Sequence, residues 1–258
     1  MTAPRSAPPS APGAILAAPR EVTQRTVIGH SVRGRPIAAV RLGDPRAAHP
    51  LLVVGAIHGD EPAGIAIARL LIKRASAGAP ALVVVPDLNP DGAAADTRQN
   101  ADGVDLNRNF PYGWRHLYQR GDQQYQGPRP LSEPESQAVR RLIIELRPVV
   151  TIWFHQPLGL VDRSSGDAAV EDWFAALVGL PVRQLVRYPG SVPTWQNHRF
   201  TGTTAFVVEL PPGQLTARAS ARYARAVLRL AASSAADCSS PCRLSRCRSS
   251  RRTGRCRP

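Results

Sequence analysis

Two patterns of apolar and polar positions alternate along most of the chain: short, nearly continuous apolar runs, and segments in which apolar residues recur at helical spacing. Nearly continuous apolar runs are typical of strands that are buried on both faces of a parallel sheet. We expect such strands at residues 51–57, 81–85, 149–154 and 205–210. Shorter β-prone runs predict further strands at residues 26–30, 37–42 and 182–186.

Between these runs, apolar residues recur at helical spacing. This spacing predicts helices at residues 62–74, 132–146, 168–178 and 216–232. Ser132 is the expected N-cap of the second of them, because serine is favoured at that position. The alternation predicts a three-layer α/β/α fold whose central sheet is mixed and mostly parallel.

Two long polar segments, residues 89–126 and 188–203, interrupt this pattern. We expect both to be loops. A loop of such length inside a compact domain is usually functional or disordered.

The two ends of the chain differ in composition from the middle. Residues 1–21 are rich in Ala and Pro, and residues 233–258 are rich in Ser, Arg and Cys. We predict that both are disordered extensions of one domain at residues 22–232. The start does not resemble a secretion signal and no apolar run is long enough to span a bilayer, so we expect a cytoplasmic protein.

The formal net charge of +14 is not evidence of nucleic-acid binding. Seven arginines and no acidic residue lie within residues 238–258, which therefore carry half of that charge. Lys73 is the only lysine among the 33 basic residues, a bias that indicates coding composition. No nucleic-acid-binding motif is recognisable, so we expect no nucleic-acid partner.

All four cysteines, at positions 238, 242, 247 and 256, fall in the same tail. The predicted domain therefore has no disulfide framework. The loose spacing of these cysteines disfavours a zinc site of their own.

A histidine and a glutamate follow the apolar run 51–57 directly, as His58 and Glu61. His155 ends another predicted strand. Ligands of open α/β sheets bind at the carboxyl ends of the strands, and a catalytic zinc commonly has three N or O ligands and one open position. The alternative is a surface turn with a solvated histidine and glutamate.

Several other motifs follow in order along the chain. They are Asn89-Pro90-Asp91-Gly92, Val104 to Phe110, Phe154-His155 and Val208-Glu209-Leu210. On these motifs the chain resembles the zinc metallocarboxypeptidase family over residues 22–232, and in particular its bacterial murein peptide amidase branch, which cuts a cell-wall peptide. The resemblance implies a catalytic domain that binds one Zn²⁺ per chain and hydrolyses the C-terminal amide of a small peptide.

The same resemblance implies a metal site. His58, Glu61 and His155 would be the zinc ligands, and Asp105 would orient His58. Glu209 would act as general base on the zinc-bound water.

It also implies groups that bind the substrate. Arg98 would stabilise the oxyanion. Asn107 and Arg108 would hold the terminal carboxylate of the peptide. Tyr188 lies in a suitable loop, although no motif fixes its match to the tyrosine of the family.

One departure from the branch concerns specificity. Gln156 stands where this branch tends to have Glu. Because glutamine carries no charge, this difference argues against specificity for a diaminopimelate substrate. Asp162 is a candidate for contacting a substrate amine, but we interpret it as an ordinary surface residue. Two alternatives to a peptidase stay open: a zinc-dependent N-acyl amino acid deacylase, similar to aspartoacylase, and an inactive peptide-binding relative. The oligomeric state is not predicted.

Overall fold

The computed structural model describes residues 23–74 and 79–239, without the side chains of residues 234–239. The predicted N-terminal extension, residues 1–21, lies outside the described residues. So do residues 240–258 of the predicted C-terminal extension.

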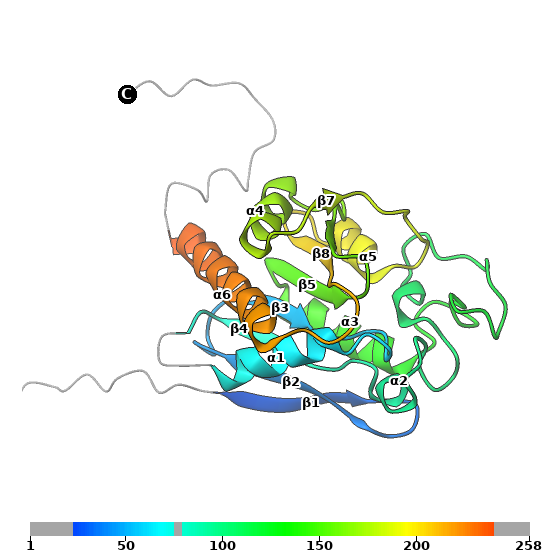
Figure 1. Ribbon diagram of the computed structural model, residues 1–258. Coiled ribbons are helices and arrows are strands. Elements are labelled where there is room, and N and C mark those ends of the chain that lie inside the picture. The colour runs from blue at the N-terminus through cyan, green and yellow to red at the C-terminus, as the bar shows by residue number, and fades with distance from the viewer. Residues whose placement is uncertain (1–22, 75–78, 240–258) are drawn as a thin grey trace, which may run out of the picture.

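Within the described residues, eight strands form one mixed sheet in the order β1-β2-β4-β3-β5-β8-β6-β7 (Figure 1). The strands are β1 (Gln24–His30), β2 (Pro36–Leu42), β3 (Leu51–Val54), β4 (Leu82–Val85), β5 (Val150–His155), β6 (Leu160–Asp162), β7 (Val182–Arg183) and β8 (Thr204–Glu209). Strands β4, β3, β5 and β8 run parallel. Their carboxyl ends therefore meet at one edge of the sheet.

The central strands are buried on both faces, as their apolar sequences predict. Leu51 and Val53 of β3 pack into one core cluster. Leu52 and Val54 pack into the other. This alternation follows from the two-residue period of a strand.

Helices cover both faces of the sheet (Figure 1). On one face lie α1 (Ala63–Lys73), α4 (Ala168–Val178) and α6 (Ala217–Ser239). On the other lie α3 (Pro134–Leu146) and α5 (Val192–Arg199). The predicted three-layer α/β/α fold with a mixed, mostly parallel sheet is thus confirmed.

The two segments expected to be loops contain helices, so that expectation was wrong in part. Segment 188–203 holds α5, and segment 89–126 holds α2 (Pro90–Ala95) and the 3₁₀ turn η1 (Leu106–Arg108). Helices α2 and α5 begin in the same way. The N-cap side chain, Asn89 in α2 and Ser191 in α5, accepts a hydrogen bond from a backbone N–H of the first turn. A proline occupies one of the first two helical positions in both.

Several boundaries also differ from the prediction; for example, the strand expected at residues 51–57 ends at Val54. Helix α6 continues to Ser239 instead of ending near residue 232, because no glycine or proline interrupts the sequence there. The N-cap of α3 is Glu133 rather than Ser132. The hydroxyl of Ser132 instead donates to Glu133 Oε1 at 2.6 Å. Strand β7 ends at Arg183, short of the predicted residue 186.

In the described part of the chain, no helix combines the length and the apolar character that crossing a bilayer requires.

Candidate active site

His58 and Glu61 lie in the turn between β3 and α1, at the carboxyl edge of the sheet. The turn is packed tightly against α2. A Cβ added at Gly59 would lie 1.9 Å from the carbonyl carbon of Gly92, so a larger residue there would displace the backbone beside His58. The lack of a side chain at this position lets the turn that carries His58 and Glu61 approach α2 closely.

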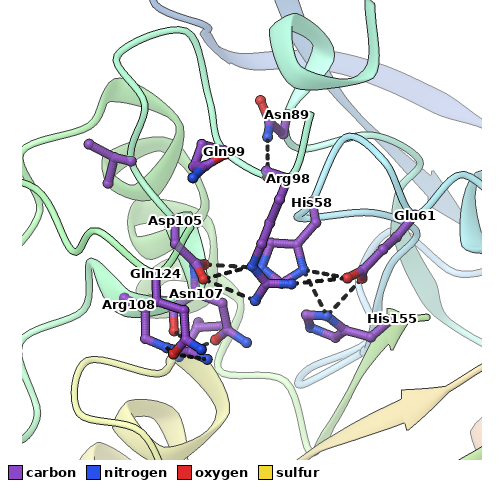
Figure 2. A network of polar contacts seen from close by, with 12 residues as sticks. His58, Glu61, Asn89, Arg98, Gln99, Asp105, Asn107, Arg108, Gln124 and His155 are labelled. Atoms are coloured by element: carbon purple, nitrogen blue, oxygen red, sulfur yellow. Dashed lines mark hydrogen bonds and ion pairs between the residues drawn. The ribbon is translucent and has the colours of Figure 1, made fainter. Parts of the chain in front are cut away.

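Three buried side chains converge at this edge (Figure 2). His58 Nδ1 lies 2.8 Å from Glu61 Oε1, and His155 Nδ1 lies 3.0 Å from Glu61 Oε2. The two Nδ1 atoms are 3.2 Å apart. The predicted trio therefore comes together, although His155 is 97 residues from His58 in the sequence.

Asp105 lies on the other side of His58. Its Oδ1 is 3.0 Å from His58 Nε2, and its carboxyl is completely buried. A carboxylate there favours the tautomer with the proton on Nε2, which leaves a lone pair on Nδ1. That lone pair points toward a carboxylate oxygen and a second ring nitrogen, an arrangement that a cation stabilises.

The spacing of these donor atoms fits zinc. A tetrahedral zinc with ligands at about 2.0–2.1 Å separates neighbouring ligand atoms by roughly 3.3 Å. His58, Glu61 and His155 offer one ligand atom each, all within 4.8 Å of one another. Two imidazoles and one carboxylate form a donor set typical of a catalytic zinc with an open position.

The charged groups of His58, Glu61 and His155 shift one another's pKa values. Burial acts to raise the pKa of Glu61, but His58 and His155 outweigh it and hold this pKa well below its usual range. Burial also acts to lower the pKa of His58, and the carboxylates of Glu61 and Asp105 outweigh it, so this pKa is raised. A site that favours positive charge so strongly is suited to a metal cation.

Glu209 ends β8, directly opposite His155 at the end of β5. Its Oε2 is covered from solvent and has no hydrogen-bond partner among the described residues. Burial raises the pKa of Glu209, although His155 partly opposes this effect. A carboxylate with a raised pKa and one unpartnered oxygen beside a candidate metal site is suited to proton transfer.

Arg98 crosses in front of His58 and joins two carboxylates (Figure 2). Its Nε lies 3.0 Å from Asp105 Oδ2, and its Nη1 lies 3.3 Å from Glu61 Oε1. Its side chain is 23% exposed, so the guanidinium also reaches the cavity.

Asn107 and Arg108 belong to η1. Asp105 is the N-cap of this turn, because its side chain accepts a hydrogen bond from the Asn107 backbone N–H. Asn107 Oδ1 accepts from the Val192 backbone N–H at 3.0 Å. The Arg108 guanidinium lies 4.2 Å from the ring centre of Tyr188. These predicted substrate-binding residues are therefore neighbours.

One cavity of about 270 Å³ contains all of these groups except Asp105. Its size is close to the lower end for small-molecule sites. Asp162 also lines the cavity and is only 4% exposed, so the interpretation of Asp162 as an ordinary surface residue was wrong.

Gln156 has a structural function that the sequence did not reveal. Its backbone N–H donates to Glu61 Oε2 at 3.1 Å, and its side-chain Oε1 accepts from the Ala63 N–H at 2.9 Å. Its Nε2 donates to the carbonyls of Pro211 and Gly213, which follow β8. Gln156 thus connects the turn carrying Glu61 to the segment after Glu209.

Arg187 also lines the cavity and was missed by the sequence analysis. It follows no motif and is one of many arginines in the chain. Position in the sequence gave no signal that would have distinguished it.

Comparison with known proteins shows what the chain resembles. The zinc carboxypeptidase family model matches residues 14–157. Murein peptide amidase A of Escherichia coli (strain K12) is 32% identical over 181 residues, which cover 65% of this chain and 74% of that protein. Murein peptide amidase A of Vibrio campbellii is 34% identical over 200 residues, which cover 72% and 79%.

A solved structure extends this similarity to the fold. The crystal structure of murein-tripeptide amidase from Escherichia coli O157 superposes with a TM-score of 0.67 at 28% identity, covering 85% of this chain and 96% of that one. The mixed sheet with helices on both faces is common to the two.

Proposed function

Because this chain belongs to the zinc carboxypeptidase family and is a zinc peptide hydrolase, we propose that it removes the C-terminal residue of a small murein peptide. The observation that carries this proposal is a single cavity lined by His58, Glu61, His155, Glu209 and Arg108. It combines a donor set for a metal, a candidate base and a cation for a terminal carboxylate.

In this proposal His58, Glu61 and His155 hold one Zn²⁺, and Asp105 keeps His58 in the tautomer that presents Nδ1. Bound zinc would polarise the scissile carbonyl and lower the pKa of a water molecule. The fit of the three donor atoms to zinc spacing supports this assignment.

Glu209 takes a proton from the attacking water and returns it to the nitrogen of the leaving residue. Its raised pKa supports this function, because a base works best when its pKa lies closer to the working pH.

Arg98 stabilises the negative charge that develops on the scissile carbonyl oxygen. Its position between Glu61 and Asp105 fixes the guanidinium without using all of its N–H donors. A fixed cation of this kind stabilises the transition state more than the substrate.

Asn107 and Arg108 hold the terminal carboxylate of the peptide, with Tyr188 beside them. Among the described residues, Arg108 has no carboxylate within ion-pair distance; its donors go to the Asn107 carbonyl and to Gln124 Oε1. Burial lowers the pKa of Arg108, as expected for a cation that lacks a close anionic partner. A substrate carboxylate would provide that partner.

The proposal is tested by incubating zinc-loaded protein with a murein tripeptide and with N-acyl amino acids. We expect release of the C-terminal residue from the tripeptide and no measurable deacylation. Preferential deacylation would instead identify an N-acyl amino acid deacylase. Absence of both activities would contradict the proposal.

A further inference from the structure

Arg98 and Asp105 stand at the two ends of a tight turn that Asn100 closes. The backbone N–H of Asn100 donates to the Val104 carbonyl at 3.0 Å, and the Gly103 N–H donates to the Asn100 carbonyl at 3.0 Å. The side-chain Oδ1 of Asn100 accepts from the Val104 N–H at 3.0 Å. One residue therefore fixes the path of the chain between Arg98 and Asp105.

This path determines how Arg98 meets Asp105 (Figure 2). Arg98 Nε and Nη2 lie 3.0 and 2.9 Å from Asp105 Oδ2. Asp105 Oδ1 lies 3.0 Å from His58 Nε2. Both oxygens of the carboxylate are thus engaged, and hydrogen bonds weaken steeply when their geometry is lost. A displacement of the turn would therefore lengthen the contact with Arg98 or the contact with His58.

The amide nitrogen of Asn100 anchors the turn to helix α3. Its Nδ2 donates to Glu133 Oε2 at 2.7 Å and to Glu135 Oε2 at 3.1 Å. Glu133 is the N-cap of α3, and Glu135 lies in its first turn. Asn100, Glu133 and Glu135 are 4%, 3% and 0% exposed. The turn is thus linked to a rigid element by hydrogen bonds that water does not reach.

The chemistry of this anchor suits an amide. Asn100 Oδ1 accepts from backbone N–H groups while Nδ2 donates to two carboxylates, and an amide offers both an acceptor and a donor. Within the described residues, these carboxylates have no cation at ion-pair distance; their other bonds come from the Ser132 hydroxyl and the Val32 N–H. Burial raises the pKa of Glu135, and the carboxylate of Glu133 adds to this effect. A third carboxylate at this point would be unfavourable.

We propose that Asn100 is a positioning residue that holds Arg98 and Asp105 in their relative positions. Asn100 does not line the cavity, so its effect must pass through these two side chains. The expected effect on turnover rests on the proposed function. The expected effect on zinc affinity depends only on the contact between Asp105 and His58.

Asn100→Asp tests the proposal, because it keeps the acceptor oxygen and turns the donor into a second oxygen that faces Glu133 and Glu135. We expect kcat on a murein tripeptide to fall by about 10- to 100-fold, the range for loss of an outer partner. KM should change little, since Arg98 acts on the transition state. Competition against a chromogenic chelator should show zinc affinity falling by about 10- to 100-fold.

The double variant Asn100→Asp/Glu133→Gln exchanges the amide and the carboxylate across the same contact. A donor again faces an acceptor, so this variant should regain most of the lost kcat and zinc affinity. Glu133→Gln alone leaves an acceptor for Asn100 Nδ2 and should resemble the wild type. Asn100→Ala removes the anchor without adding charge, and it replaces Asn100→Asp in the comparison with wild type if the latter does not fold.

Val178→Ala controls for lost stability. Val178 is fully buried in α4, on the face of the sheet opposite α3. Its truncation lowers the free energy of unfolding without reaching the turn. At a temperature at which circular dichroism shows every variant to be folded, Val178→Ala should keep wild-type kcat and zinc affinity.

Wild-type kcat and zinc affinity in the folded variant at position 100 would overturn the inference. An equal loss in Val178→Ala would overturn it too, and so would a loss that the double variant does not recover. If the wild-type chain cleaves no murein peptide, the proposed function fails and the chelator assay alone decides. Loss of zinc affinity in Asn100→Asp and its recovery in the double variant would then support the inference, and unchanged affinity would contradict it.

Discussion

His155 and Glu209 are paired residues at the last positions of two adjacent parallel strands, β5 and β8. Paired residues of neighbouring strands project from the same face of a sheet. The candidate metal ligand and the candidate base are therefore held by backbone hydrogen bonds rather than by a loop. Their separation is fixed before any substrate binds, as efficient electrostatic catalysis requires.

This relationship gives the first prediction. Glu209→Gln keeps the size of the side chain and removes its ability to take a proton. We expect zinc content to be unchanged and kcat/KM to fall by at least about 10²-fold. Glu145→Gln, on the exposed side of α3, is the control and should have wild-type activity. Unchanged turnover of Glu209→Gln would remove Glu209 from the mechanism.

Asp105→Asn tests how His58 is oriented. Asparagine still accepts a hydrogen bond from Nε2–H but carries no charge, so His58 becomes a weaker ligand. Loss of such an outer partner typically weakens metal binding by about 10- to 100-fold. Competition against a chromogenic chelator measures this, with the exposed Asp102→Asn as control. Equal zinc affinity in both variants would show that Asp105 does not tune the site.

Arg108→Gln tests recognition of the substrate terminus. We expect kcat/KM to fall by about 10- to 100-fold on a peptide with a free C-terminal carboxylate, the range for a charged hydrogen bond. A peptide ending in a carboxamide should be a poor substrate for the wild type and should be affected far less. Steady-state assays of both peptides measure the difference. An equal loss on both would indicate that Arg108 acts elsewhere than on the carboxylate.

Asp87 predicts a pH dependence of stability. Burial raises its pKa from 3.8 to about 6 in the folded chain. Folding thus favours the protonated form, and the free energy of unfolding contributed by Asp87 falls as the pH rises from about 4 to about 6. Asp87→Asn keeps an oxygen acceptor for the Asn89 N–H and should stabilise the protein at pH 7 by about 1–3 kcal/mol.

Urea denaturation at pH 4 and pH 7 measures this effect. The gain from Asp87→Asn should be small at pH 4, where the carboxyl is protonated in the folded chain. A variant that is less stable than wild type at pH 7 would show that the charge of Asp87 is favourable.

The sequence was most informative where strand ends determine position. The sequence predicts that the side chains of His58, Glu61 and His155 lie close together, because each follows an apolar run that is typical of a central strand in a parallel sheet. The contact between Asp105 and His58 could only be inferred from resemblance, because it depends on the path of residues 89–126. That path is fixed by long-range contacts such as the hydrogen bond from Asp105 N–H to the Tyr125 carbonyl at 2.7 Å.

Other features were hidden for identifiable physical reasons. Helix α5 has little amphipathic pattern, and only the serine and proline at its start signal a helix. Arg187 becomes distinctive only when its ion pair with Asp162 is known, since that contact depends on tertiary structure. Gln156 is similar: its substitution for Glu is visible in the sequence, but its hydrogen bonds to Ala63 and Pro211 are not.

The central claim is that His58, Glu61 and His155 together bind one zinc ion. It is tested most directly by stripping the protein with a chelator, adding zinc, and measuring bound metal by mass spectrometry of the intact, natively folded chain. We predict one zinc per chain for the wild type and for His198→Ala, whose histidine lies against Tyr112 away from the trio. We predict no retained zinc for His155→Ala; retention of one equivalent by that variant would contradict the account.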